Sequence, residues 1–286
     1  MPKKAIAILA RAPVQGLLSF YGQFRAYGFN VFCIIDDNSY RVTQSHQVQC
    51  VQINNKECVS FGFSNFAPPY RCAAWDKALY YFCKLHPDYD YVWFIEDDVL
   101  IPSVDTLVSI DRKYDYADII SAPYIVNESG RADGWHWWKH VPDEMPPPWC
   151  RAMVCAVRLS NTVLKSVAHF TDANAMRLAR SNTVTTIMNS RGIWRLRKRF
   201  ASLFGYRLHK QHLRYPFIEF TFHTLAMHGR KCIVGAKELE SVVWREAWRT
   251  ADMTTECFYH PVKDISAHEF YRQQIGERPR SPSSGR

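Results

Sequence analysis

Short apolar runs that alternate with amphipathic stretches are the feature that most restricts how this chain folds. Residues 5–10 (AIAILA) and 30–37 (NVFCIIDD) are such runs, and residues 16–27 between them carry apolar side chains at helical spacing. A short apolar run without a helical period predicts a buried strand. A strand, a helix and a second strand in this order predict a parallel βαβ unit.

The alternation continues beyond this unit. Residues 70–87 and 103–114 have the pattern of helices, and residues 91–98 (YVWFIEDD) and 118–126 have the pattern of two further strands. The whole series predicts an α/β fold of the Rossmann-like kind, with a mostly parallel central sheet flanked by helices.

The second half of the chain has a different composition. Residues 127–149 contain four tryptophans and four prolines, and residues 151–160 again predict a strand. We expect one domain made of two halves, residues 1–126 and 127–275. A low-complexity tail at residues 276–286 is expected to be disordered.

Composition excludes several classes of protein. With 47% hydrophobic and 22% charged residues, the chain has enough apolar surface for a core and differs from a disordered protein. No apolar run approaches the roughly 18 residues that span a bilayer, and the N-terminal run is too short for a signal peptide. The nine cysteines include no CxxC pair, which predicts free thiols in a reducing compartment. We therefore expect a cytoplasmic protein.

The net charge of +9 comes from one segment. Residues 191–214 hold eight of the 36 Lys and Arg residues and no acid, which leaves 28 basic against 27 acidic residues elsewhere. A broad nucleic-acid-binding face would spread this charge over more of the chain, so we expect no nucleic-acid partner. The segment is also amphipathic, and three interpretations stay open: peripheral membrane contact, a lid over an anionic ligand, or a solvated helix.

Carboxylates end two of the predicted strands. Asp36 and Asp37 end one, and Glu96, Asp97 and Asp98 end another. Ligands of α/β sheets bind at this edge, and the two groups converge there if their strands are neighbours. Alternation along an extended chain points Glu96 and Asp98 to one side and Asp97 to the other. Such oxygen ligands suit Mg²⁺ or Mn²⁺, which also hold phosphates, although a solvated turn is the simpler alternative.

The order of these elements, over about residues 5–262, resembles that of GT-A-type glycosyltransferases. In that family an Asp-x-Asp-like motif ends a central strand and holds the metal and the donor diphosphate. Glu96, Asp97 and Asp98 stand in this place, with Glu where the first Asp is usual. The resemblance implies a Mn²⁺- or Mg²⁺-dependent enzyme that moves a sugar from a nucleotide-diphosphate donor to a glycan, glycolipid or protein acceptor. The resemblance implies that Asp98 is the principal metal ligand. It leaves open whether Glu96 contacts the metal or only the ribose of the donor.

The same resemblance implies roles for residues outside the motif. The half at residues 1–126 is expected to bind the nucleotide sugar, and the half at 127–275 the acceptor. For Arg71 and Lys77, solvent-facing positions on a helix are an equal alternative. The expected nucleotide-sugar contacts are Arg11, Asp36, Asp37, Arg71, Lys77, Glu96, Asp97 and Lys263.

Two later motifs supply a candidate base and a candidate metal ligand. Glu219 lies in the apolar stretch 217–229, a setting that raises the pKa of a carboxyl group and suits a general base. Inverting members of the family carry an acidic base at the start of a helix in this region; helix-dipole stabilisation is the alternative. His260, in CFYHPVKD, resembles the C-terminal His that completes the metal shell, with a buried structural His as the alternative.

The tryptophan-rich loop is a candidate acceptor site. Trp135, Trp137 and Trp138 offer flat faces that suit stacking on sugar rings, and Asp133 offers a hydrogen-bond acceptor for hydroxyl groups. Packing of these tryptophans in a core is the alternative.

Two other functions compete with a transferase of sugars. A nucleotidyltransferase acting on sugar phosphates also uses metal-bound carboxylates, but its Gly-rich loop is missing from LARAPVQGLL after the first strand, which has one glycine. A non-catalytic carbohydrate-binding module explains the tryptophans and leaves the acidic strand ends unexplained.

Overall fold

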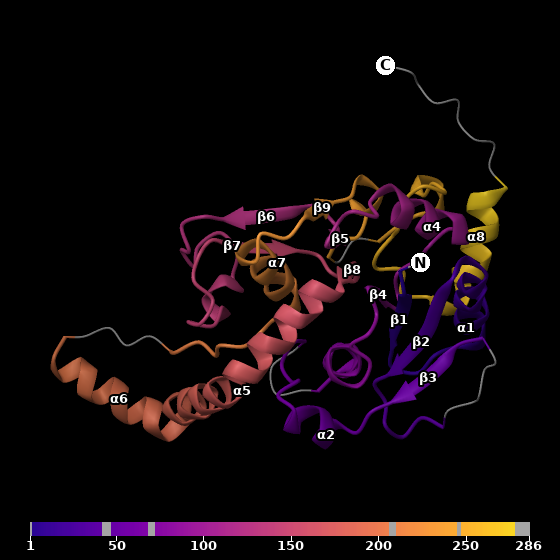
Figure 1. Ribbon diagram of the computed structural model, residues 1–286. Helices are drawn as coiled ribbons and strands as arrows, with labels where there is room; N and C mark the ends of the chain where they lie inside the picture. Colours follow the sequence, from indigo (N-terminus) through magenta and orange to yellow (C-terminus); the bar gives the residue numbers. More distant parts are fainter. Residues whose placement is uncertain (1, 42–46, 68–71, 206–209, 245–246, 278–286) are drawn as a thin grey trace, which may run out of the picture.

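The computed structural model describes residues 2–41, 47–67, 72–205, 210–244 and 247–277. Within these residues the centre of the fold is a seven-stranded sheet with the strand order β3-β2-β1-β4-β8-β5-β9 (Figure 1). Its strands are β1 (Lys4–Ala10), β2 (Phe29–Ile35), β3 (Gln49–Gln52), β4 (Tyr91–Glu96), β5 (Ile119–Ser121), β8 (Ala156–Ser160) and β9 (Ile233–Gly235).

Most neighbouring strands of this sheet are parallel. β1 pairs in parallel with β2 and β4, β2 with β3, and β5 with β9. Among the described strands of this sheet, only β8 runs antiparallel to its neighbours, which are β4 and β5. The predicted α/β fold with a mostly parallel sheet is therefore confirmed, and β1, the helix α1 (Gln15–Gly22) and β2 form the predicted βαβ unit.

Helices cover both faces of the sheet, because its strands carry apolar side chains on both sides. Ala5 of β1 belongs to one buried cluster together with side chains of α3, α5 and α7. The next residue, Ile6, belongs to a second cluster together with side chains of α1 and α4. Three layers result, with the sheet in the middle. The bounds of these helices are α3 (Ala74–Tyr80), α4 (Val104–Lys113), α5 (Asn161–Asn189) and α7 (Ile218–His228).

Two of the predicted strands are divided in the structure. The stretch 118–126 forms β5 and β6 (Tyr124–Asn127), and Pro123 lies between them. Proline has no N–H for a strand ladder, so the pairing changes at this point. The stretch 151–160 is likewise split between β7 (Trp149–Ala152) and β8. β6 and β7 form a separate antiparallel pair, and α7 packs against β7.

A long helical arm leaves the body of the molecule. The first half of α5 packs in the core through Val163 and Val167, whereas Met176 and Val184 in its second half are exposed. α6 follows, and Figure 1 shows it far from the sheet. No described helix has the length and apolar character needed to cross a membrane. The other described elements are η1 (Gln23–Tyr27), α2 (Asn55–Ser60), η2 (Tyr81–Leu85), η3 (Trp138–His140), α6 (Arg191–Leu203), η4 (Lys237–Leu239), η5 (Thr250–Asp252), η6 (Ile265–Ala267) and α8 (His268–Gly276).

Candidate active site

The carboxylates predicted to line one crevice lie along the carboxyl edge of the sheet. Glu96 ends β4, and Asp36 follows directly after β2. The two strands are not neighbours, because β1 pairs with β2 on one side and with β4 on the other. The condition under which the two acidic groups converge, that their strands are neighbours, is therefore not met. The strand order, which depends on long-range packing, inserts β1 between the two acidic strand ends.

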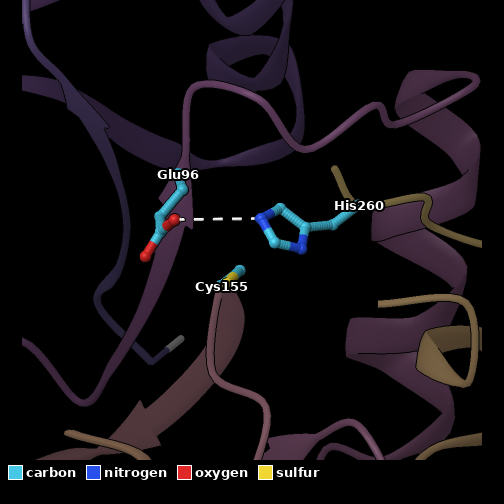
Figure 2. Close-up of side chains that lie close together, drawn as sticks. All are labelled: Glu96, Cys155 and His260. Atoms are coloured by element: carbon cyan, nitrogen blue, oxygen red, sulfur yellow. Dashed lines mark ion pairs between the residues drawn. The ribbon is translucent and has the colours of Figure 1, made fainter. Parts of the chain in front are cut away.

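Glu96, Asp98 and His260 converge at the end of β4. The Nε2 atom of His260 lies 4.0 Å from Glu96 Oε2 and 3.4 Å from Asp98 Oδ1. Figure 2 shows the imidazole facing the Glu96 carboxylate, with Cys155 beside them. Glu96 and Asp98 thus both lie beside His260, although Asp98 stands in the turn after β4 and not in the extended strand that the alternation argument assumed.

His260 is held in a fixed orientation by its backbone and its second ring nitrogen. The backbone of His260 pairs with that of Val242 in an isolated β-bridge. The carbonyl of His260 accepts a hydrogen bond from Trp248 Nε1 at 3.0 Å. Nδ1 donates to the carbonyl of Val243 at 2.8 Å, which leaves Nε2 facing the carboxylates and free to bind a cation whenever the ring is neutral. Burial lowers the pKa of His260, but the adjacent Asp98 and Glu96 outweigh this effect and raise it overall.

Glu96 and Asp98 occupy different electrostatic environments. Burial raises the pKa of Glu96. A hydrogen bond from Trp75 Nε1 at 2.7 Å orients the carboxylate and acts to lower its pKa, but the effect of burial is larger. Burial also acts to raise the pKa of Asp98, but His260 and the ion-paired ammonium of Lys263 lower it to about 2. Asp98 is therefore the carboxylate of this cluster that stays ionised most readily.

Asp97 points away from this cluster and toward the end of β1. Burial and the charges of Asp98 and Glu96 raise the pKa of Asp97 to about 6, and the backbone N–H of Arg11 acts against them. The side chain of Arg11 is exposed. Asp97 and Arg11 therefore lie on the same edge of the sheet as the cluster. The exposed guanidinium of Arg11 is accessible to an anionic ligand.

A divalent cation fits the chemistry of the cluster. Asp98 Oδ1 is buried and makes no hydrogen bond among the described residues; its ion-pair neighbour is His260 Nε2 at 3.4 Å, a contact that neutralises the carboxylate only while the imidazole is protonated. A buried carboxylate oxygen without a partner is costly unless a cation satisfies it. Glu96, Cys155 and His260 each offer one ligand atom, and these atoms lie within 4.8 Å of one another. Oxygen, nitrogen and sulfur donors of this kind are those that divalent metals use in proteins.

Glu219 lies in the first turn of α7, as the sequence predicts. Burial raises its pKa to about 7; the charge of Arg151 acts against this shift and the charge of Glu96 with it. A carboxyl group with this pKa accepts a proton near neutral pH. Phe222, one turn after Glu219 on α7, packs against Trp75 at a ring-centroid distance of 5.8 Å, and Trp75 donates to Glu96, so α7 lies near the cluster.

Lys77 has a structural position that neither sequence interpretation describes. It is fully buried, and its ammonium donates hydrogen bonds to the carbonyl of Asp36 at 2.6 Å and to Asn38 Oδ1 at 2.9 Å. It therefore fixes the turn after β2 and does not face solvent. Asp37 accepts two hydrogen bonds from Ser39, which lower its pKa. Arg71 lies outside the described residues.

The tryptophan loop packs against α7. Trp138 is only 4% exposed and contacts Trp149 at a ring-centroid distance of 5.7 Å. It is therefore a core residue, as the alternative interpretation expects, and its buried ring leaves little surface for stacking on a sugar. Trp135 and Trp137 are half-buried, and Asp133 is exposed. The guanidinium of Arg151 lies 4.7 Å from the ring centroid of Trp135.

Sequence reasoning missed Cys155 and Trp75 as members of the site. Each stands in an apolar stretch and reads as an ordinary core residue. Cys155 reaches Glu96 because β8 pairs antiparallel with β4, and its carbonyl accepts the Glu96 N–H at 2.8 Å. No local pattern announces that pairing.

In comparisons with known proteins, this chain is similar to others in structure but not in sequence. No family model matches the chain, and no curated protein matches it in sequence. Its structure is similar to that of the galactosyltransferase LgtC in complex with donor and acceptor sugar analogues, with 11% identity, a TM-score of 0.41 and 98% of each chain covered. An active-site mutant of LgtC gives 10% identity and a TM-score of 0.42 over the same share of both chains. Mouse xyloside xylosyltransferase 1 gives 12% identity and a TM-score of 0.35, covering 82% of this chain and 84% of its own. Since the TM-scores are below 0.5, the function proposed next depends on the residues of the site.

Proposed function

We propose that this protein is a metal-dependent glycosyltransferase that moves a sugar from a nucleotide-diphosphate donor to a hydroxyl group of a glycan, glycolipid or protein acceptor. One observation carries the proposal: Glu96, Asp98 and His260 converge at the end of a central strand, where Asp98 Oδ1 is buried without a hydrogen-bond partner among the described residues. The carboxyl edge of an α/β sheet is where such folds bind ligands.

The cluster would hold the cation and present it to the donor. Asp98, His260 and Glu96 are the proposed ligands, and Mn²⁺ or Mg²⁺ are the proposed ions. When bound, such an ion supplies positive charge that stabilises a leaving diphosphate. Trp75 keeps the Glu96 carboxylate in place through its indole N–H. Lys263, whose side chain is 77% exposed beside Asp98, is placed to reach a phosphate oxygen.

Other residues of the edge would bind the nucleoside and the diphosphate. We propose that Asp36 and Asp37 contact the nucleoside and that the exposed Arg11 contacts base or phosphate. The buried Lys77 would act indirectly, because its hydrogen bonds to the turn after β2 hold Asp36 in position. These assignments follow from their shared place at the carboxyl edge of the sheet.

Glu219 would act as the general base. Its carboxylate takes the proton of the acceptor hydroxyl while the hydroxyl oxygen forms a bond to the anomeric carbon and the bond to the diphosphate oxygen breaks. Attack from the face opposite the leaving group inverts the anomeric configuration. The pKa of about 7 supports this role near neutral pH. The half-buried Trp135 and Trp137 and the exposed Asp133, near the same helix, would contact the acceptor.

Turnover of a nucleotide sugar is the direct test. Purified protein incubated with Mn²⁺ or Mg²⁺ and a panel of nucleotide sugars should release the nucleoside diphosphate from one donor or a few related donors. EDTA should abolish the release, and added metal should restore it, because the cation stabilises the leaving diphosphate. The measurement is chromatographic detection of the released nucleotide.

Two outcomes would contradict the proposal. If no donor is bound or hydrolysed with any divalent metal, the transferase function is wrong. If a sugar 1-phosphate and a nucleoside triphosphate yield pyrophosphate, the protein is a nucleotidyltransferase.

We further propose that α6 contacts an anionic membrane surface and that the protein acts in the cytoplasm, where its nine free cysteines persist. Leu196, Phe200 and Leu203 on α6 are 56%, 57% and 78% exposed, among five Lys and Arg residues between 191 and 199. An exposed amphipathic helix with a basic face binds anionic lipid. Figure 1 shows α6 away from β4, the strand that ends at Glu96, which favours this role over a lid on the donor.

The double variant Phe200→Asp/Leu203→Asp should lower binding to phosphatidylserine vesicles at least about tenfold, because it removes apolar anchors and adds negative charge. Vesicle co-sedimentation at two salt concentrations measures the effect. The matched control is Tyr116→Asp/Phe270→Asp, which replaces residues that are 64% and 56% exposed elsewhere. Equal binding of both variants and the wild type would contradict a contact through α6.

A further inference from the structure

Cys155 belongs to the active-site cluster, but the mechanism above gives it no role. It is 6% exposed, and its Sγ atom lies within 4.8 Å of ligand atoms of Glu96 and His260. In Figure 2 its side chain lies beside the carboxylate and the imidazole. The arrangement joins a thiol, a carboxylate and an imidazole around one point.

The backbone fixes Cys155 in this place. The next residue, Ala156, begins β8 and stands opposite Ile95 in the ladder with β4. The carbonyl of Cys155 accepts the N–H of Glu96 at 2.8 Å. The thiol is therefore held opposite Glu96 by sheet hydrogen bonds, and no loop movement is needed to bring it there. Met153 Sδ, a second soft donor, lies 3.6 Å from the thiol sulfur.

An independent observation indicates a cation at the same point. Asp98 is 7% exposed, and its Oδ1 atom is aimed at His260 Nε2 without a hydrogen-bond partner among the described residues. This oxygen belongs to a different strand end from the thiol. Asp98 therefore adds a second carboxylate beside the imidazole, while Glu96, Cys155 and His260 form the group whose ligand atoms lie within 4.8 Å of one another.

We propose that Cys155 is a ligand of the metal in this site and that the site therefore binds Zn²⁺ and Co²⁺ more tightly than Mg²⁺. Thiolate and imidazole ligands suit these ions, whereas Mg²⁺ requires oxygen ligands. The ligand is the thiolate, so binding breaks the S–H bond and releases its proton to solvent. The inference rests on the proposed function, which supplies the reason for a cation at this edge.

A titration of the full-length protein with CoCl₂, followed by absorption spectroscopy, tests the proposal. The wild type should show the intense near-ultraviolet charge-transfer band of a cobalt–thiolate bond at one equivalent, and Zn²⁺ should abolish it while equimolar Mg²⁺ should not. Cys155→Ser should lose the band and lower Zn²⁺ affinity at least about tenfold, since even loss of an outer-shell partner costs about 10- to 100-fold.

The matched control is Cys83→Ser. Cys83 is also buried, and its thiol donates to the carbonyl of Leu164, a bond that a serine hydroxyl can keep. This variant should retain the cobalt band. Should Cys155→Ser fail to fold, X-ray absorption of the wild-type Zn²⁺ complex gives the answer, with one sulfur neighbour expected at about 2.3 Å.

Three outcomes overturn the proposal: no binding of Co²⁺, binding without the thiolate band, or a band that persists in Cys155→Ser. Nucleotide-sugar turnover, measured on the same preparations, separates this proposal from the function. Turnover with Mn²⁺ or Mg²⁺ and no thiolate band rejects Cys155 as a ligand and supports the transferase. A thiolate band without binding of any nucleotide sugar rejects the transferase and supports the ligand.

Discussion

Asp98→Asn should lower nucleotide-sugar turnover at least about a hundredfold, because it removes the charge of the principal proposed metal ligand, and loss of a mere outer-shell partner already costs about 10- to 100-fold. Asparagine has nearly the shape of aspartate, so the space beside His260 stays filled. It cannot form the ion pair with Lys263 or present a negative oxygen toward His260 Nε2. Steady-state turnover across a series of metal concentrations measures the effect, and the metal concentration for half-maximal rate should rise.

The control for this variant is Asp172→Asn. Asp172 forms a surface ion pair with Lys84 at 2.6 Å, so the control removes the same kind of contact away from the sheet edge. Its turnover should equal that of the wild type, because exposed ion pairs contribute little. A folded Asp98→Asn protein with wild-type turnover and unchanged metal dependence would reject the metal site.

Glu219→Gln should lower turnover by about 10²- to 10⁴-fold, the usual contribution of a general base, while donor binding stays near wild type. The wild-type rate should rise with pH through about 7, because the carboxyl group must lose its proton before it can accept one. Glutamine has no such ionisation, so the variant should lack this rise. The pH profile of turnover, together with NMR of the product's anomeric configuration, checks the role.

Glu269→Gln is the matched control, because Glu269 also lies in the first turn of a helix, α8. Both changes remove a carboxylate that interacts favourably with a helix dipole. Only the change at Glu219 should alter the rate and its pH dependence. A retained rate, or a product with retained configuration, would reject Glu219 as the base of an inverting reaction.

Local patterns in the sequence predict the parts of this fold that depend on neighbouring residues. The apolar run before Glu96 is long enough for a strand and is buried on both sides, so both the strand and its acidic end are visible in the sequence. The apolar surroundings of Glu219 likewise predict its raised pKa. Breaks such as that at Pro123 are less visible, because the apolar residues on both sides suggest one continuous strand.

Long-range pairing is what the sequence does not reveal. The position of β1 between β2 and β4 depends on how whole strands pack, and Cys155 becomes a neighbour of Glu96 only through the antiparallel β8. Arg158 gives a second case. Arginine is seldom fully buried, but this one is, and it forms an ion pair with Asp111 at 2.9 Å.

The helix α5 sets a length scale for this molecule. It is continuous over 29 residues, and at about 1.5 Å per residue it is roughly 40 Å long. One end is anchored beside the sheet, and the other carries α6. Because a helix neither stretches nor shortens, α5 acts as a ruler between the sheet and whatever surface α6 touches. Acceptors attached to that surface would be selected by their height above it as well as by their chemistry.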